Sequence, residues 1–210
     1  MAATRVHLVR HGEVNNPGGI LYGRLPGFGL TERGHRMAQR LAEHFSAADV
    51  THLVASPLQR AQETIAPLAQ TLDLPVHTDD RVIEADSVFE GLDLGPRPGQ
   101  LAHPRYWRSL VNPFRPSWGE PNVEIVARMT GAIRAARDAA EGHAAVLVSH
   151  QNPIWTTRRS LEGRSFVHDP RRRQCTLASV TTLTFDGATL VGLDYAEPAG
   201  DLLVGAKAIT

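Results

Sequence analysis

Cysteine and lysine are almost absent from this chain of 210 residues. The single cysteine, Cys175, excludes an internal disulfide and any zinc site built from several cysteines, and it suits a reducing compartment. The single lysine, Lys207, lies close to the C-terminus. It is too late in the chain to serve a Gly-x-x-x-x-Gly-Lys phosphate loop, which excludes a Walker-type nucleotide hydrolase.

Long apolar runs and an excess of charge of one sign are also missing. The first residues, MAATRVHLVRHGE, hold too short an apolar stretch for a signal peptide, and no later stretch is long enough for a membrane span. Lys plus Arg and Asp plus Glu each total 22, so the formal net charge is zero. We therefore expect a cytoplasmic protein without a nucleic-acid or membrane partner, in which any anion site is local.

Strand and helix signals alternate along the chain, which predicts an α/β fold. The residue pattern predicts strands at 5–9, 51–56 and 144–150, and helices at 31–45, 57–72, 123–141 and 153–161. Thr31 is expected to cap the first of these helices, and Pro57 is expected to open the second.

The expected architecture is one domain over residues 1–210. We predict a three-layer α/β/α sandwich with a mostly parallel central sheet. Asp186 and Gly187 join two β-rich runs, which indicates a C-terminal hairpin. Residues 92–121 are rich in proline and lack periodicity, so we predict an inserted, lid-like segment there.

Three predicted strands end in polar residues that can bind an anion. The first ends in Arg10 and His11, the second leads through Ser56 to Arg60, and the third ends in His150. In open parallel sheets the ligand crevice lies at the carboxyl ends of the strands, so these side chains are expected to converge. Two guanidinium groups can hold a phosphoryl group by paired hydrogen bonds. The sequence therefore predicts a phosphate pocket.

The histidines in this pocket have an expected division of roles. Neighbouring guanidinium groups lower the pKa of imidazole, so His11 is expected to be neutral and able to attack phosphorus, which divides the displacement into two steps. Gly12 is expected to let the backbone approach the phosphate. His150 is expected to donate to a phosphoryl oxygen, and Glu84 is the candidate proton donor for the leaving group, with Glu90 as its competitor.

Four segments in order, LVRHGE, SPLQRAQETI, RVIEADSVFEG and VLVSHQNPI, resemble the histidine phosphatase superfamily, the phosphoglycerate mutase-like proteins, over nearly the whole chain. The resemblance implies that His11 is phosphorylated, that Arg10, Arg60 and His150 bind the phosphoryl group, and that Glu84 donates the proton. It implies no metal or organic cofactor, and the remaining histidines show no metal-ligand spacing.

Departures from the family pattern gather around the predicted substrate mouth. Pro17 replaces an asparagine that many members carry six residues after the nucleophile, and Asn16 stands beside it as a possible substitute. We take Asn16, Tyr22 and Arg24 as candidates for the mouth, with packing as the alternative role for Tyr22. The run Arg171 to Arg173 either extends the anion site or, as such runs more often do, lies in a solvated loop.

These features favour a cofactor-independent phosphatase that acts on small phosphomonoesters through a phosphohistidine on His11. The alternative within the family is a phosphoglycerate mutase, which the absence of a long basic insertion disfavours. The alternative outside catalysis is a sensor that binds a phosphorylated ligand without turnover. The expected partner is thus a small phosphorylated molecule, and no oligomeric state is predicted.

Overall fold

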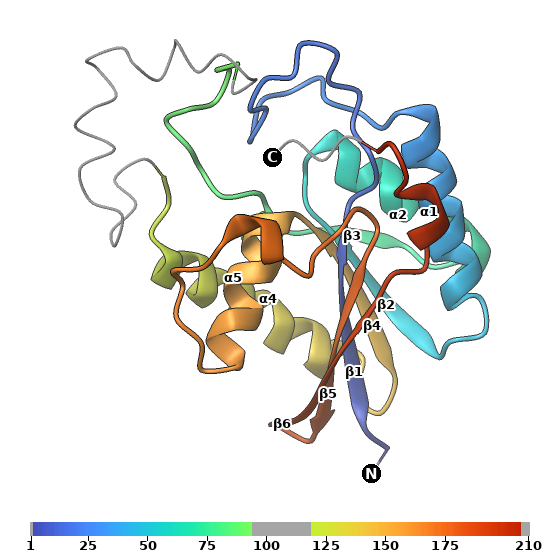
Figure 1. Cartoon of the computed structure of the whole chain (residues 1–210). Helices are drawn as coiled ribbons and strands as arrows, with labels where there is room; N and C mark the ends of the chain where they lie inside the picture. Colours follow the sequence, from blue (N-terminus) through green and yellow to red (C-terminus); the bar gives the residue numbers. More distant parts are fainter. Residues whose placement is uncertain (1, 94–118, 207–210) are drawn as a thin grey trace.

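The computed structural model describes residues 2–93 and 119–206, in which strands and helices alternate (Figure 1). The strands are β1 (Thr4–Arg10), β2 (Val50–Ala55), β3 (Val76–Thr78), β4 (Ala144–Ser149), β5 (Val180–Asp186) and β6 (Thr189–Ala196). The helices are α1 (Glu32–Phe45), α2 (Gln59–Leu72), α4 (Asn122–Ala139) and α5 (Gln151–Leu161), with short 3-10 turns at Asp80–Val82, Pro170–Arg172 and Gly200–Leu202.

The described strands form a six-stranded sheet in the order β3-β2-β4-β1-β5-β6. The first four strands of this order pair in parallel, whereas β5 runs antiparallel to β1 and β6 antiparallel to β5. All residues of β4 are buried, because the strand is central and both of its faces are covered. The prediction of a mostly parallel sheet is confirmed.

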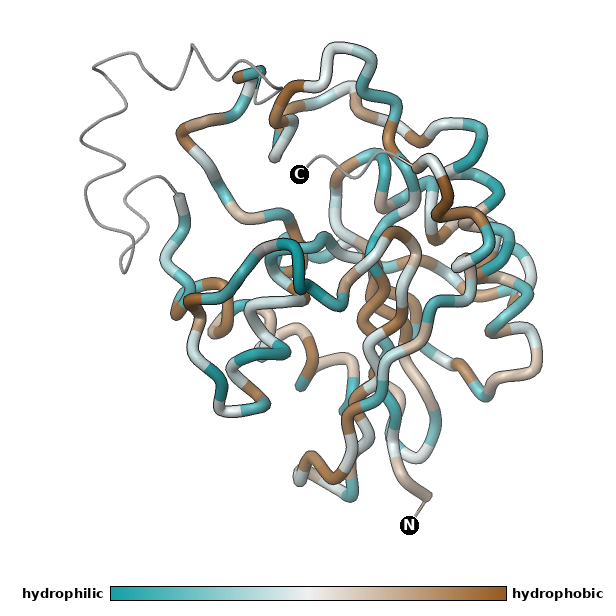
Figure 2. Tube along the Cα trace, viewed as in Figure 1, coloured by the Kyte–Doolittle hydropathy of each residue, from teal (hydrophilic) through white to brown (hydrophobic). Residues whose placement is uncertain are grey.

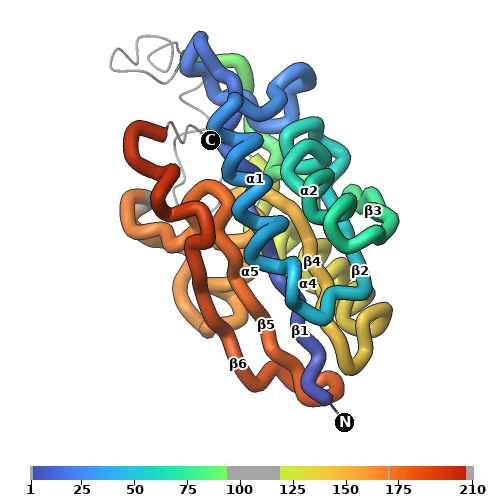
Figure 3. Tube along the Cα trace, turned by 90° about the vertical axis from the view of Figure 1, so that its right-hand side faces the viewer, coloured from blue at the N-terminus to red at the C-terminus, as the bar shows by residue number. Residues whose placement is uncertain are grey.

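Helices cover both faces of the sheet, and this confirms the three-layer arrangement. Helices α1 and α2 lie on the face seen in Figure 3, and α4 and α5 lie on the opposite face. Each side chain buried between helix and sheet contributes roughly 1.5–3 kcal/mol. One core layer contains Met37, Leu41, Phe45, Ile65 and Leu68 against Val9 and Val146, and the other contains Ile125, Met129, Ile133 and Ile154 against Leu8 and Leu147. Apolar residues run through the central strands in Figure 2.

The helix ends follow local chemistry, but the starts of α2 and α5 and both ends of α4 differ from the predicted bounds. The Thr31 hydroxyl accepts the backbone N–H of Gly34 at 2.9 Å, which confirms the predicted cap of α1. Helix α2 begins at Gln59 and not at Pro57, because Leu58 still has an extended backbone. Helix α5 begins at Gln151, two residues before its predicted start, directly after β4.

The predicted hairpin at the C-terminal side is present. Strands β5 and β6 pair from Val180 with Ala196 to Asp186 with Thr189. Gly187 takes a φ of 54° in the turn between them, a conformation that glycine adopts without strain.

The predicted lid at 92–121 lies mostly outside the described residues, which omit 94–118. Its described flanks pair with the rest of the chain, Asp93 with Ile20 and Gly119 with Ser87. Both flanks therefore lie beside segments that follow strand ends. Within the described part of the chain, no helix has the length and apolar character needed to cross a membrane.

Candidate active site

Strands β1 and β4 end side by side, and the predicted site residues meet at this edge. Arg10 is the register partner of Ser149. The backbone N–H of His11 donates to the carbonyl of Ser149 at 3.1 Å, which carries the strand pairing one residue further. The ring centroids of His11 and His150 are 5.2 Å apart. Parallel pairing thus brings together two histidines that are far apart in the sequence.

Two buried arginines flank these rings. Arg10 and Arg60 are each 1% exposed. Arg10 Nη1 donates to the Cys175 carbonyl at 2.7 Å, and Arg60 Nη2 donates to the Gly23 carbonyl at 2.6 Å. Among the described residues, Nε and Nη2 of Arg10 and Nε of Arg60 have no hydrogen-bond partner. Buried charged donors without partners are costly, so this arrangement suits a strong acceptor such as a phosphoryl oxygen.

His11 is held in one tautomer. Its Nδ1 lies 2.8 Å from the Gly12 carbonyl, and since a carbonyl only accepts, Nδ1 must carry the hydrogen. Nε2 is buried and has no partner among the described residues. Burial, followed by the charges of Arg60 and Arg10, holds the pKa of His11 well below its usual value. The neutral ring therefore keeps a lone pair on Nε2, which is what a nucleophile requires.

Gly12 is required by the packing of β1 against α1. Its N–H donates to the Thr64 hydroxyl at 3.1 Å. A Cβ at this position would lie 2.7 Å from the Gly34 carbonyl oxygen in α1, closer than real Cβ contacts come. The end of β1 and helix α1 thus approach each other closely at Gly12. The approach of this backbone to a phosphate stays a prediction.

His150 is oriented by Ser56. The His150 backbone forms the N-cap of α5, and its Nε2 lies 2.8 Å from the Ser56 hydroxyl. That hydroxyl accepts the N–H of Leu58 at 3.4 Å, so its hydrogen is free to be donated to Nε2. His150 Nδ1 is buried and has no partner within the described residues. Burial and then Arg60 lower the pKa of His150.

Glu84 and Glu90 have different environments, which favour Glu84 as the acid. Glu84 is 6% exposed, and burial raises the pKa of its carboxyl although nearby arginines oppose that rise. One Glu90 carboxylate oxygen accepts the Arg24 backbone N–H at 2.7 Å and occupies the space that a Cβ on Gly23 would need. Glu90 therefore stabilises a turn, whereas Glu84 is buried near the two phosphate-site arginines.

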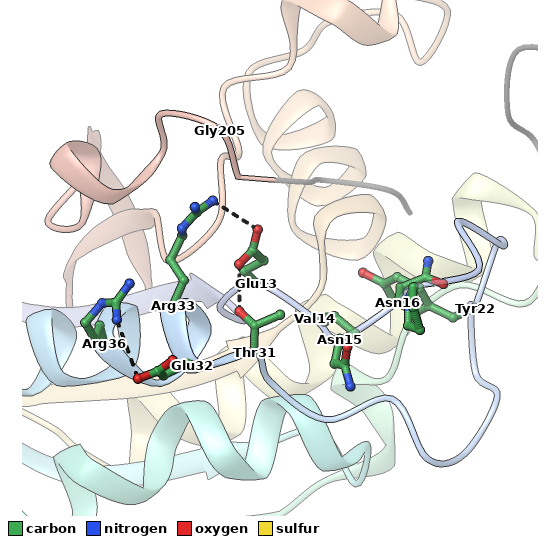
Figure 4. Close-up of a pocket in the computed structure, with 11 residues that line it drawn as sticks. Glu13, Val14, Asn15, Asn16, Tyr22, Thr31, Glu32, Arg33, Arg36 and Gly205 are labelled. Atoms are coloured by element: carbon green, nitrogen blue, oxygen red, sulfur yellow. Dashed lines mark hydrogen bonds and ion pairs between the residues drawn. The ribbon is translucent and has the colours of Figure 1, made fainter.

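A cavity of about 410 Å³ lies beside the loop that follows His11 (Figure 4). Two of the predicted mouth residues, Asn16 and Tyr22, line it together with Glu13 and Arg33. The Asn16 side chain also closes its own loop, because its amide bonds both the carbonyl and the N–H of Ile20, at 2.8 and 3.2 Å. Substrate contact by Asn16 and Tyr22 stays a prediction.

Tyr22 and Arg24 each contact a residue of the predicted site. The Arg60 guanidinium lies 4.8 Å from the centroid of the Tyr22 ring, a cation–π contact. Arg24 does not line the cavity; its Nε donates to the Glu84 carbonyl at 2.7 Å, and its Nη2 pairs with Glu120 at 3.0 Å. Arg24 thus contacts the segment that carries the candidate acid.

The arginines of the run Arg171 to Arg173 differ in their exposure. Arg171 and Arg172 are exposed, as a solvated loop predicts, but Arg173 is partly buried. Its Nε donates to His168 Nε2 at 2.9 Å, and burial lowers its pKa while Glu84 opposes that shift. Arg173 therefore belongs to the positive surroundings of the site.

Within residues 2–93 and 119–206, no group of three or more His, Cys, Asp or Glu side chains is arranged to hold a metal ion. That the reaction needs no metal stays a prediction.

A family model described as the histidine phosphatase superfamily, branch 1, matches residues 6–197. The chain belongs to the histidine phosphatase superfamily. It is 55% identical to the uncharacterized protein Rv0525 of Mycobacterium tuberculosis, over 93% of this chain and 97% of that protein. It is 35% identical to a probable phosphoglycerate mutase, GpmB, of Cronobacter sakazakii, over 70% of this chain and 69% of that protein.

Solved structures agree with this family. The structure of YhfR from Bacillus stearothermophilus matches with a TM-score of 0.71 at 26% identity, and covers 90% of this chain and 94% of its own. The sequence-based recognition of a histidine phosphatase is therefore confirmed, together with its α/β fold.

Some residues of the candidate site were missed by sequence reasoning. Thr64 and Arg128 lie on helices where isolated polar residues read as solvated, and Ser56 reads only as a helix start. Their contacts to Gly12, to the Ile83 carbonyl and to His150 join segments distant in sequence. No local signal distinguishes Thr64 and Arg128, whereas Ser56 is the last residue of a predicted strand.

Proposed function

We propose that this histidine phosphatase hydrolyses small phosphomonoesters through a phosphohistidine on His11, without a cofactor. The observation that carries the proposal is the set of buried nitrogens without partners among the described residues. Five of these six nitrogens belong to Arg10, Arg60, His11 and His150, which lie at the ends of β1 and β4 or at the start of α2; the sixth, Arg158 Nη1, lies in α5. Three guanidinium donors, one imidazole lone pair and one imidazole N–H suit a tetrahedral phosphoryl group.

The first step transfers the phosphoryl group to the protein. His11 Nε2 attacks phosphorus, so that a P–N bond forms while the ester P–O bond breaks. The electron pair of that bond stays on the leaving oxygen, which takes the proton of the Glu84 carboxyl. Arg10, Arg60 and His150 hold the nonbridging oxygens, on which negative charge lies.

The second step returns the site to its starting state. Water attacks phosphorus, the P–N bond breaks, and the electron pair returns to His11 Nε2. The Glu84 carboxylate takes one proton from that water, which restores the acid for the next cycle. Inorganic phosphate then leaves.

The test compares the wild-type protein with His11→Ala and with a matched control, His35→Ala. His35 is an exposed histidine in α1, so its variant is expected to keep wild-type rates. His11→Ala is expected to lose turnover of both 4-nitrophenyl phosphate and glycerol phosphate. Rapid alkaline denaturation of the wild type during turnover should leave phosphate on the peptide that contains His11. Full activity of His11→Ala would refute the nucleophile. Loss of wild-type activity with a chelator would refute the metal-free mechanism.

Phosphoglycerate mutase activity is the second candidate, because a relative at 35% identity is named a probable phosphoglycerate mutase. In that reaction the phosphohistidine returns its phosphoryl group to a bound acceptor and not to water. Incubation with 3-phosphoglycerate and a bisphosphoglycerate primer separates the two activities. Phosphate release faster than isomer formation is expected; the reverse would favour the mutase. Binding without either product would favour a sensor.

A further inference from the structure

Glu84 lies next to a closed cluster of three charged side chains that come from three separate segments. Glu120 bridges two arginines: its carboxylate accepts Arg128 Nε at 2.6 Å and Nη2 at 2.9 Å, and it accepts Arg24 Nη2 at 3.0 Å. Glu120 and Arg128 are largely buried, with side chains 12% and 16% exposed, and Arg24 is 34% exposed. We call Arg24, Glu120 and Arg128 the charged clamp.

Each arginine of the clamp also binds backbone carbonyls around Glu84. Arg128 Nη1 donates to the carbonyls of Arg81 and Ile83, both at 2.7 Å. Arg24 Nε donates to the carbonyl of Glu84 itself at 2.7 Å. The segment from residue 81 to residue 84 is thus held by a guanidinium on each side, and Glu120 fixes the two guanidinium groups relative to each other.

The backbone of the clamp is also fitted to this segment. The Glu120 N–H donates to the Asp86 carbonyl at 3.2 Å, and Gly119 pairs with Ser87. A Cβ on Gly119 would lie 2.4 Å from the Asp86 carbonyl oxygen, so only glycine permits this approach. The chain therefore reaches Glu120 by a contact that excludes every other residue type at position 119.

The Glu84 side chain depends on this backbone for its position. Its carboxylate accepts only the N–H of the next residue, Ala85, at 2.8 Å among the described contacts. A carboxyl group held by its own backbone moves when that backbone moves. Burying three charges is a poor way to gain stability, since desolvation offsets most of the attraction between them. Planar guanidinium groups with paired hydrogen bonds do, however, fix geometry well.

We propose that Arg24, Glu120 and Arg128 are positioning residues, which hold the Glu84 carboxyl where it can protonate the leaving oxygen. This inference rests on the proposed function, in which Glu84 supplies that proton as the ester P–O bond breaks. The clamp itself touches no reacting atom in this reaction. Its effect is therefore largest for alkyl esters, whose leaving oxygen needs the proton, and small for aryl esters, which leave as stable phenolates.

The test measures kcat/KM for glycerol phosphate and for 4-nitrophenyl phosphate in Arg128→Met. A displacement of a catalytic group by about an ångström costs about 100-fold. We expect a loss of about 10- to 100-fold with glycerol phosphate and of about threefold with 4-nitrophenyl phosphate. The matched control is Arg134→Met on the same helix, an exposed arginine for which no side-chain hydrogen bond or ion pair is found among the described residues. It should match the wild type on both esters.

A double-mutant cycle with Glu84→Gln distinguishes positioning from a general structural role. If the clamp acts through Glu84, Arg128→Met should not change the ratio of the two rates further in a Glu84→Gln protein. Equal losses of kcat/KM on both esters would overturn the inference. It would also be overturned if Arg128→Met changed the ratio of the two rates as much in the Glu84→Gln protein as in the wild type. If Glu84→Gln alone leaves the ratio unchanged, the acid assignment of the proposed function fails, and the positioning role fails with it.

Two further variants keep the test valid if Arg128→Met folds poorly, which its thermal melting would show. Arg128→Lys keeps the charge but cannot bind the carboxylate in two places, so partial recovery of the glycerol phosphate rate is expected. Arg24→Met removes one hydrogen bond to the Glu84 carbonyl and one to the Glu120 carboxylate, from a more exposed side chain. A folded Arg24→Met protein with wild-type rates on both esters would contradict the clamp.

Discussion

Substitution of Gly12 by alanine is the sharpest test of how the nucleophile is held. The added methyl would lie 2.7 Å from the Gly34 carbonyl oxygen and 3.2 Å from the Gly34 carbonyl carbon and Cα. Neither the Gly12 backbone nor the Gly34 backbone can move away easily. Gly12 is bonded to Thr64, and a Cβ on Gly34 would itself lie 2.1 Å from the Glu13 carbonyl oxygen. The two glycines form a tight backbone contact between β1 and α1.

The expected magnitudes follow from this contact. Overpacking of a well-packed interior costs about 1–3 kcal/mol. A chain of this size loses about 2–4 °C of Tm per kcal/mol, so Tm should fall by roughly 2–12 °C. The Gly12 carbonyl accepts His11 Nδ1, so a shift of this peptide turns the nucleophile. A displacement of about an ångström would cost about 100-fold in kcat/KM.

Calorimetry and the rate with 4-nitrophenyl phosphate measure both effects. The matched control is Gly18→Ala in the following loop, where the nearest atom to an added Cβ is the Ile20 Cγ2 at 3.8 Å. This control should keep the wild-type Tm and rate. Gly12→Ala with an unchanged Tm and an unchanged kcat/KM would refute the proposed packing and the role of the Gly12 carbonyl in orienting His11.

Three further results are expected from the charges of the molecule. Burial lowers the pKa of His7 to about 4, below its unfolded value of 6.5, so the unfolded chain binds the proton first and stability falls as pH falls between these values. His7→Gln should remove up to about 3 kcal/mol of that pH dependence in urea unfolding, and equal pH slopes in both proteins would contradict it. Arg60→Met should lower kcat/KM by about 100- to 1000-fold. Because Arg60 lowers the pKa of His11, this variant should also move the acid limb of the pH profile to higher pH. An acid limb at the wild-type pH would show that Arg60 does not lower the pKa of the nucleophile. Glu84 donates only when protonated, and burial raises its pKa, so the glycerol phosphate rate should fall as pH rises through that pKa. Persistence of this limb in Glu84→Gln would assign the acid to Glu90 or to water.

Much of the fold was predictable because its signals are local. The buried run of β4, the Thr31 cap and the Asp186-Gly187 turn each depend on residues within one element or one turn. The start of α2 was wrong by two residues, since a proline that suits a first helical position also suits the extended segment before it. The ends of a helix are set by backbone hydrogen bonds, and many different sequences can form those bonds equally well.

The candidate site was partly predictable because parallel strands bring their ends to one edge. This rule alone placed Arg10, His11 and His150 together. It gave no information on Arg128 or Glu120, whose partners are 8 to 96 residues away in the sequence. It also gave no sign that Gly12 contacts α1.

The sequence by itself determined the family, the alternation of strand and helix, and the residue types at three strand ends. These properties depend on the hydrophobic period, the turn residues and the order of the motifs, all of which can be read directly from the sequence. Only the tertiary structure decided which ring nitrogen of His11 is free, which of Glu84 and Glu90 is buried near the arginines, and how the Glu84 backbone is held. Those properties arise from hydrogen bonds and burial between distant segments, and such contacts exist only once the sheet has brought the segments together.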